Sequence, residues 1–214
     1  MNRNIIHTSN FKERLPIVLF CLLWGIAIAS AISYILESYL SQIISVSFLF
    51  FVIFVPIIEE STKISGLFFI KKWLNESNTG FLLGISAGIG FAITETFIYG
   101  LKYSNQAFLV IIAFLFLRII GAGIMHASST GILGYGYANY TKNKKPFTYL
   151  IPFFTSAIMI HALFNLITFS AQSFNQVFLI LLSVLFSLIL MLILTKKIYL
   201  FEKNKKTFQP NPSN

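Results

Sequence analysis

Three ionisable residues stand together inside an apolar stretch, in the run Glu59-Glu60-Ser61-Thr62-Lys63. Lys63 follows Glu59 by four residues and Glu60 by three, so both ion pairs can form on one face of a helix. A charge in hydrocarbon costs at least ~2.5–3.5 kcal/mol, so three charges together need a reason. A carboxylate held beside a second one at low dielectric can deprotonate water near neutral pH. The same trio can also be a neutralised structural patch.

Five further polar residues lie in apolar stretches, namely Glu95, Arg118, His126, His161 and Asn165. Each has a structural interpretation: the Glu and His side chains can bond a neighbouring helix, and Arg118 can neutralise a carboxylate. Asn165 follows His161 by four residues and can hold its ring. Taken together, ionisable groups at membrane depth mark an ion path or an active site.

Hydrolysis is the chemistry that suits these residue types. His and Glu can bind Zn²⁺ and leave an open position for water. Alternatively, His161 and Asn165 can donate hydrogen bonds to a developing oxyanion with no metal. The sequence contains no serine-nucleophile motif, no HExxH helix and no phosphate-binding glycine loop.

The composition indicates an integral membrane protein. Of the 214 residues, 56% are hydrophobic and 11% are charged, and the mean hydropathy is +0.78, whereas soluble domains carry roughly 25% charged residues. The net charge of +9 is explained by topology and by contact with anionic lipid, so nucleic acid is not expected as a partner. The single cysteine, Cys21, excludes an intrachain disulfide and a cysteine-based zinc site.

The fold that must position these residues is an all-α polytopic membrane protein of about six transmembrane helices. Residues 16–195 form one transmembrane domain between an N-terminal tail, 1–15, and a basic tail, 196–214. The apolar runs that we expect to span the bilayer are 16–36, 43–70, 79–100, 106–140, 147–169 and 174–194. Because the polar set lies on the second to fifth runs, we expect a four-helix polar core.

Three of these runs have particular features. A cleavable signal peptide is the alternative for 16–36, although its apolar residues continue past the small-residue sites. Glycines at four-residue spacing in 79–100 favour close helix packing. The run 106–140 is long for one span, so it should tilt, kink near Gly121 and Gly123, or project from the bilayer.

The basic residues of the loops indicate an orientation. Residues 1–15, 71–78, 141–146 and 195–214 hold thirteen Lys and Arg residues, whereas the loops on the opposite side hold one. Basic residues concentrate on the cytoplasmic side. We therefore expect a multi-pass membrane protein with both termini in the cytoplasm.

Four motifs in order resemble the PrsW family of intramembrane proteases, within the CAAX-protease and bacteriocin-processing superfamily. Glu59 to Lys63 resembles the EExxK motif, and Phe91 to Glu95 resembles FxxxE. His126 and the residues after it resemble the third motif, and His161 to Asn165 resembles HxxxD/N. The resemblance covers roughly residues 50–170. The superfamily usually has His where Glu95 stands, which favours the PrsW branch and argues against prenyl-protein processing.

The resemblance implies an intramembrane endopeptidase in which Glu59 is the general base. It implies that Glu60 supports Glu59 and that Lys63 balances the charge. It also implies that Glu95, His126 and His161 hold the water directly or through a metal, with zinc as the candidate.

By the same resemblance, Asn165 would assist His161 or the oxyanion. The implied substrate is a membrane-embedded or membrane-anchored protein, and the branch is associated with anti-sigma factors. An ion-coupled or proton-coupled transporter and a non-catalytic scaffold or immunity protein are the alternatives, although the sequence has no convincing internal repeat of the transporter kind.

Overall fold

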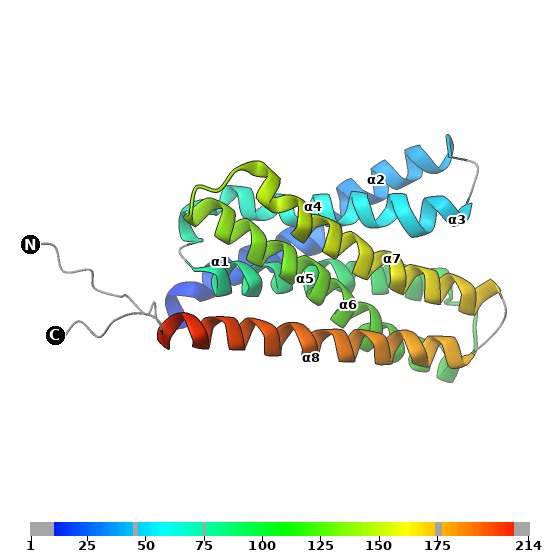
Figure 1. Cartoon of the computed structure of the whole chain (residues 1–214). Helices are drawn as coiled ribbons and strands as arrows, with labels where there is room; N and C mark the ends of the chain where they lie inside the picture. Colours follow the sequence, from blue (N-terminus) through cyan, green and yellow to red (C-terminus); the bar gives the residue numbers. More distant parts are fainter. Residues whose placement is uncertain (1–10, 45–46, 75, 174–176, 208–214) are drawn as a thin grey trace, which may run out of the picture.

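All the elements that the structure describes are helices, and they lie side by side in one bundle (Figure 1). The structure is a computed structural model that describes residues 11–44, 47–74, 76–173 and 177–207. Buried Glu and His side chains lie inside the bundle. The predicted all-α fold with a polar core is therefore confirmed.

Two helical stretches near the N-terminus each contain a π-helical turn. The first consists of α1 (Phe11–Leu23), the π turn η1 (Trp24–Ala29) and α2 (Ser30–Ser41). The second consists of α3 (Ser47–Leu49), the π turn η2 (Phe50–Phe54) and α4 (Val55–Phe69). The remaining elements are the 3₁₀ turn η3 (Lys71–Trp73), α5 (Ser77–Lys102), α6 (Phe108–Lys142), the 3₁₀ turn η4 (Phe147–Leu150), α7 (Ile151–Ser173) and α8 (Val177–Thr207).

Five helical stretches in the described part of the chain are long and apolar enough to cross a membrane. They are Arg14–Ser41, Ser77–Lys102, Phe108–Lys142, Phe147–Ala171 and Phe178–Lys197. The stretch that ends with α4 is not among them, and it carries Glu59, Glu60 and Lys63. The predicted number of about six spans thus corresponds to five apolar helices and one helix with charged residues.

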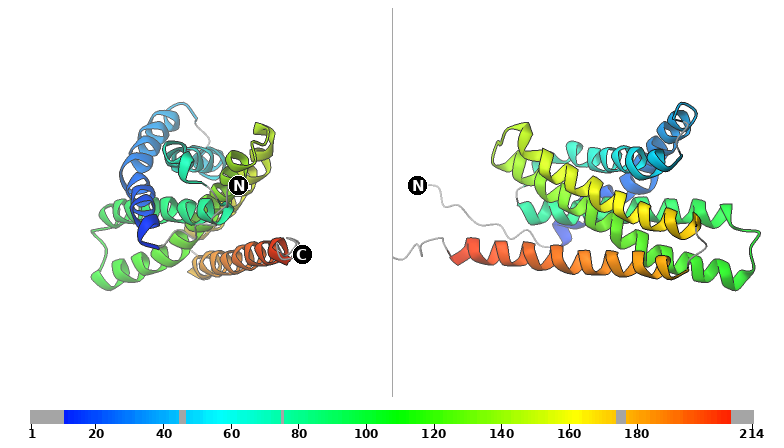
Figure 2. Two further views of the ribbon diagram at one scale, coloured as in Figure 1. Left: turned by 90° about the vertical axis from the view of Figure 1, so that its left-hand side faces the viewer. Right: turned by 45° about the vertical axis from the view of Figure 1, so that its right-hand side comes forward.

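The charged helix α4 contacts α2, α5, α6 and α7. Helix α8 packs on α6 and α7 along another side of the bundle (Figure 2). The first residues of α1 and the last described residues of α8 lie at the same end (Figure 1). Many large apolar side chains are exposed, such as those of Leu23, Phe69 and Leu109. An apolar exterior around a polar interior is the arrangement that lipid requires.

The π turns expose carbonyl oxygens that other helices use. Pro56, the second residue of α4, has no N–H to donate to the preceding turn, and the irregular turn η2 lies directly before it. In η1, Ser30 Oγ donates to the carbonyl of Gly25 at 2.7 Å. Thr94 Oγ1 of α5 donates to the carbonyl of Ile26 at 2.7 Å. These bonds satisfy backbone groups that lipid cannot.

Helices α5 and α6 touch through a face of small residues, as the glycine spacing predicts. A Cβ atom on Gly84 would meet the carbonyl oxygen of Thr130, and one on Gly88 would meet that of His126. Such an approach is the small-residue packing of membrane helices. It brings the backbone of α6 directly against α5 at His126. Helix α6 itself continues unbroken through Gly121 and Gly123.

Candidate active site

The intramembrane polar residues predicted from the sequence come from four helices and mostly meet at one buried place. Helix α4 carries Glu59, Glu60 and Lys63, α5 carries Glu95, α6 carries Arg118 and His126, and α7 carries His161 and Asn165. The side chains of Glu59, Glu60, Lys63, His126 and His161 are at most 4% exposed. Glu95 and Arg118 are more open, at 24% and 16%.

The Lys63 ammonium group lies at the centre of this cluster. Its Nζ is 3.0 Å from Glu59 Oε2 and 2.9 Å from Glu60 Oε1, so both predicted ion pairs are present. The same Nζ is 2.7 Å from His126 Nδ1. The ring of Phe91 covers the ammonium, with Nζ 4.3 Å from its centroid, and also packs on His126. Phe91 therefore shields the ion pairs from lipid.

Glu60 is fully enclosed by hydrogen-bond donors. Its Oε1 accepts from Lys63 Nζ and from Ser129 Oγ, each at 2.9 Å, and lies 3.1 Å from His161 Nδ1. Its Oε2 accepts from Thr130 Oγ1 at 2.9 Å. Both oxygens are occupied, so this carboxylate ties α4 to α6 and α7. Glu59 differs, because its buried Oε2 has no hydrogen-bond partner beyond the ion contact with Lys63.

A second carboxylate fixes the orientation of His126. The Nδ1 atom of His126 faces the Lys63 ammonium group. An ammonium group can only donate hydrogen bonds, so Nδ1 must accept. The ring proton therefore lies on Nε2, which donates to Glu95 Oε2 at 2.8 Å. Glu95 Oε2 is also 2.9 Å from Arg118 Nη2, and the Arg118 guanidinium stacks over Tyr99 at 3.8 Å.

His161 is held in the same manner by Glu60. Its Nδ1 donates to the Glu60 carboxylate, which can only accept while ionised, so the lone pair lies on Nε2. That Nε2 is 3.7 Å from Glu59 Oε2, and His126 Nδ1 is 3.8 Å from the same oxygen. The accepting nitrogens of both rings thus face one carboxylate oxygen that lacks a hydrogen bond.

These three residues could hold a metal ion. Glu59, His126 and His161 each offer one ligand atom, and the three atoms lie within 4.8 Å of one another. In metal sites, a ligating His typically donates its other ring N–H to a carboxylate. Glu95 and Glu60 stand in that position here. The donor set and its supports therefore fit a divalent metal of the zinc type.

The acidic member of this group differs from the sequence-based expectation. The sequence predicts Glu95, His126 and His161 as metal ligands, which stays a prediction. The ligand atoms that lie close together in the structure are those of Glu59, His126 and His161. The physical reason is that Glu95 Oε2 is already engaged by Arg118 and by His126 Nε2.

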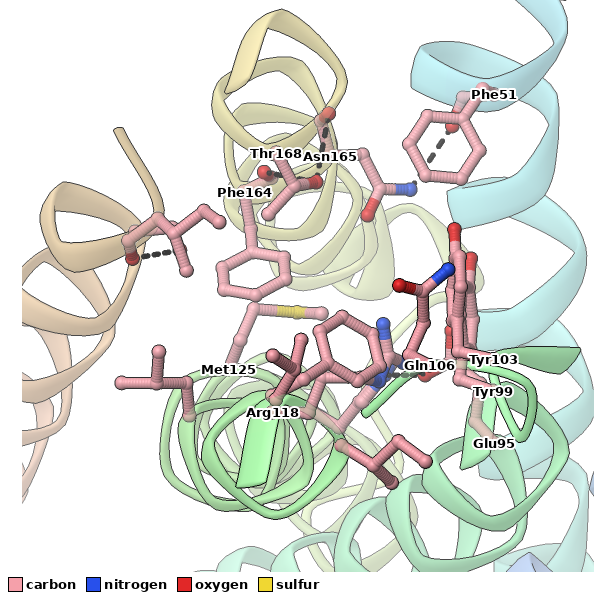
Figure 3. Close-up of a pocket in the computed structure, with 17 residues that line it drawn as sticks. Phe51, Glu95, Tyr99, Tyr103, Gln106, Arg118, Met125, Phe164, Asn165 and Thr168 are labelled. Carbon is pink, nitrogen blue, oxygen red and sulfur yellow. Dashed lines mark hydrogen bonds and ion pairs between the residues drawn. The ribbon is translucent and has the colours of Figure 1, made fainter. Parts of the chain in front are cut away.

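Asn165 lies on the edge of the cluster. Its Nδ2 donates to the carbonyl of Phe51 at 3.0 Å, so it ties α7 to the π turn η2 (Figure 3). This hydrogen bond is therefore made with η2 and not with His161. Arg118 lies where a charge-balancing residue should lie, against Glu95.

A cavity of about 490 Å³ opens beside the cluster, between α5, α6, α7 and α8. Glu95, Arg118, His126 and Asn165 form part of its lining. Figure 3 shows aromatic side chains such as Phe51 and Phe164 in the rest of the lining, together with the polar side chains of Gln106 and Thr168. The cavity therefore connects an apolar compartment with the polar cluster.

Some residues that contact the cluster were not among those predicted from the sequence. Ser129 and Thr130 bind Glu60, and they were detectable only as hydroxyls one turn after His126. Glu37 lines a cavity together with Glu59 and Glu95. Its position after the first apolar run predicts a loop residue instead. Its position directly after the apolar run that ends at Leu36 was its one signal.

A family model for the PrsW family intramembrane metalloproteases matches residues 13–194 of the chain. The match covers most of the sequence and all of the cluster described above. The protein therefore belongs to the PrsW family, which places it among multi-pass membrane proteins with intramembrane protease activity. Neither a curated protein nor a solved structure matches the chain.

Proposed function

We propose that the protein is an intramembrane endopeptidase in which Glu59 activates a water molecule for attack on a peptide bond. The observation that supports this proposal is the convergence on Glu59 Oε2. The accepting nitrogens of His126 and His161 both face this oxygen, and it lacks a hydrogen bond. A water molecule in that position would have a base beside it and the lone pair of His161 Nε2 to orient it.

The proton transfers follow from the positions of the two carboxylates. Glu60 has no free oxygen, so Glu59 is the member of the pair that takes the proton of the water. The hydroxide attacks the peptide carbonyl, and Glu59 returns the proton to the leaving amine. When no metal is bound, Lys63 stays positively charged between the two carboxylates during these transfers. Asn165 and Arg118, which line the larger cavity, bind the peptide on its way to this point.

Glu59, His126 and His161 are the residues that would hold the metal ion of a metalloprotease, with zinc as the proposed ion. When bound, such an ion supplies Lewis-acid polarisation of the water and of the carbonyl. Glu95 and Glu60 would then keep the two rings in the ligating tautomer. The Lys63 ammonium contacts two of the three ligand atoms, so its side chain must move when they bind a metal.

The apolar lining of the larger cavity supports a substrate with an apolar segment, as a single-span membrane protein has. We propose a membrane-anchored protein as the substrate, and an anti-sigma factor is one protein of this class. The basic loops support a bacterial plasma membrane location with cytoplasmic termini.

The experiment is cleavage of single-span reporter proteins in proteoliposomes by the purified protein. Glu59→Gln and His161→Ala are compared with wild type and with Glu76→Gln, which removes a carboxylate outside the cluster. We expect Glu59→Gln to lose at least ~100-fold in rate, the usual value for a general base. Equal cleavage by Glu59→Gln and wild type would overturn the proposal.

A further inference from the structure

A second, smaller cavity reaches the cluster from the side of α2. Its volume is about 230 Å³. Helix α2 contributes Ser30, Ser33, Tyr34 and Glu37 to its lining, and the other contributors are η2, α4 and α5. Glu59 and Glu95 belong to that lining, so this cavity and the larger one approach the cluster from different sides.

Two of the carboxylates that line this cavity each have one oxygen without a hydrogen-bond partner. Glu37 Oε1 is buried and has none, and Glu59 Oε2 is buried and has only the ion contact with Lys63. The side chain of Glu59 is 4% exposed. An unsatisfied carboxylate oxygen in a protein interior is costly, and ordered water is its usual partner.

The cavity has both the room and the polar groups that buried water needs. One water needs roughly 10–15 Å³ of such volume and two to four polar partners. Hydroxyls and carboxylates of α2, α4 and α5 supply those partners. A cation held between Glu37 and Glu95 is the poorer occupant, because Glu95 already has Arg118 as cationic partner.

Hydrolysis inside a membrane consumes one water molecule for each peptide bond, and lipid does not supply it. The larger cavity has Phe51, Phe114, Leu117 and Phe164 in its lining and is suited to a peptide. In the smaller cavity, Glu37 lies toward the C-terminal end of α2, whereas the π turn η1 precedes the other end of that helix. The two cavities share Phe51, Glu95 and Tyr99. Their other walls come from different helices, α2 and α4 for the smaller cavity and α6, α7 and α8 for the larger one.

We propose that the smaller cavity delivers water to Glu59 and that Glu37 is a positioning residue that binds the incoming water through Oε1. The inference rests on the proposed peptidase function. The groups that face Glu37 are Tyr34 of α2, Glu59 and Lys63 of α4, and Glu95 and Tyr99 of α5. Glu37 has no covalent part in the reaction.

Thiol labelling tests the water route without any proteolysis. In a Cys21→Ala background, single cysteines are placed by Glu37→Cys and by Ile35→Cys, and a charged water-soluble methanethiosulfonate is added. Ile35 is 64% exposed on the outside of the bundle, at nearly the same depth. We expect the thiol at position 37 to react at least ~10-fold faster, because only a hydrated thiol ionises.

A slow reaction at position 37, or equal reaction at both positions, overturns the water route. Ser30→Cys repeats the measurement with a smaller change in the same cavity, so a poorly folded Glu37→Cys does not leave the question open. The labelling decides the route even where wild type cuts no reporter. In that case the peptidase proposal fails separately.

Kinetics test the role of Glu37. For a reporter that wild type cuts, Glu37→Gln should lower kcat about 10-fold, as loss of an outer-shell partner does, and leave KM unchanged. Glu37→Asp should restore most of the rate, because it keeps a carboxylate in the cavity. Glu76→Gln should match wild type. A change in KM alone, or equal losses in the Gln and Asp variants, contradicts the positioning role.

Discussion

Glu60 should contribute more to stability than any other acidic residue of the cluster. Its carboxylate accepts from Lys63, Ser129, Thr130 and His161 and is fully buried. Glu60→Ala leaves Thr130 Oγ1 and His161 Nδ1 without their carboxylate partner and removes one of the two carboxylates beside Lys63. Removing one partner of a buried ion pair costs ~3–5 kcal/mol. We expect the free energy of unfolding, measured in mixed micelles with increasing SDS, to fall by about that amount.

The hydroxyls of Ser129 and Thr130 account for part of the stability that Glu60 provides. Hydrogen bonds between membrane helices average ~0.6 kcal/mol and reach ~1.7 kcal/mol. The double variant Ser129→Ala/Thr130→Val should therefore lose roughly 1–3 kcal/mol, less than Glu60→Ala. Glu76→Ala is the control, because its ion pair with Arg14 is on the surface. If Glu60→Ala unfolds as the control does, the carboxylate does not tie the helices together.

Two further predictions concern the metal and the helix packing. Lys63→Met should bind added Zn²⁺ more tightly than wild type, because it removes an ammonium that competes for His126 Nδ1 and Glu59 Oε2; calorimetry measures this, and weaker binding than wild type would count against the ligand set. Gly88→Val should separate α5 from α6, since a Cβ there meets the carbonyl of His126. The free energy of unfolding in SDS and the rate of reporter cleavage should both fall. Gly123→Ala, with open space at its Cβ, should behave as wild type.

Much of the site could be predicted because charge in apolar sequence is so conspicuous. The spacing of Glu59, Glu60 and Lys63 predicts two ion pairs on one helix face, and both are present. The glycines of α5 predict a close approach to another helix, and Gly88 touches the backbone of His126. These features are local, so a single sequence contains them.

The features that the sequence did not predict depend on contacts between distant segments. Which of Glu59 and Glu95 faces the two His rings is decided by Arg118, whose guanidinium engages Glu95 from another helix. Asn165 binds the carbonyl of Phe51, which is available only because η2 is a π turn. No periodicity in the sequence indicates that turn.

Glu37 shows a different limit. A span boundary drawn by hydropathy ends at Leu36, and the next residue is assigned to the loop. In the structure α2 continues to Ser41, and Glu37 lines the cavity that reaches Glu59. Hydropathy measures the cost of transfer to lipid, whereas this carboxylate lines a protein cavity rather than facing lipid.

In the proposed mechanism, Glu59 activates the water molecule that hydrolyses the peptide bond. The most direct test is reporter cleavage in heavy-oxygen water, followed by mass spectrometry of the new C-terminus. We expect wild type and Glu76→Gln to form product with one heavy oxygen atom in each new carboxylate. We expect Glu59→Gln to form almost no such product. Cleavage without incorporation of heavy oxygen, or undiminished product from Glu59→Gln, would contradict this mechanism.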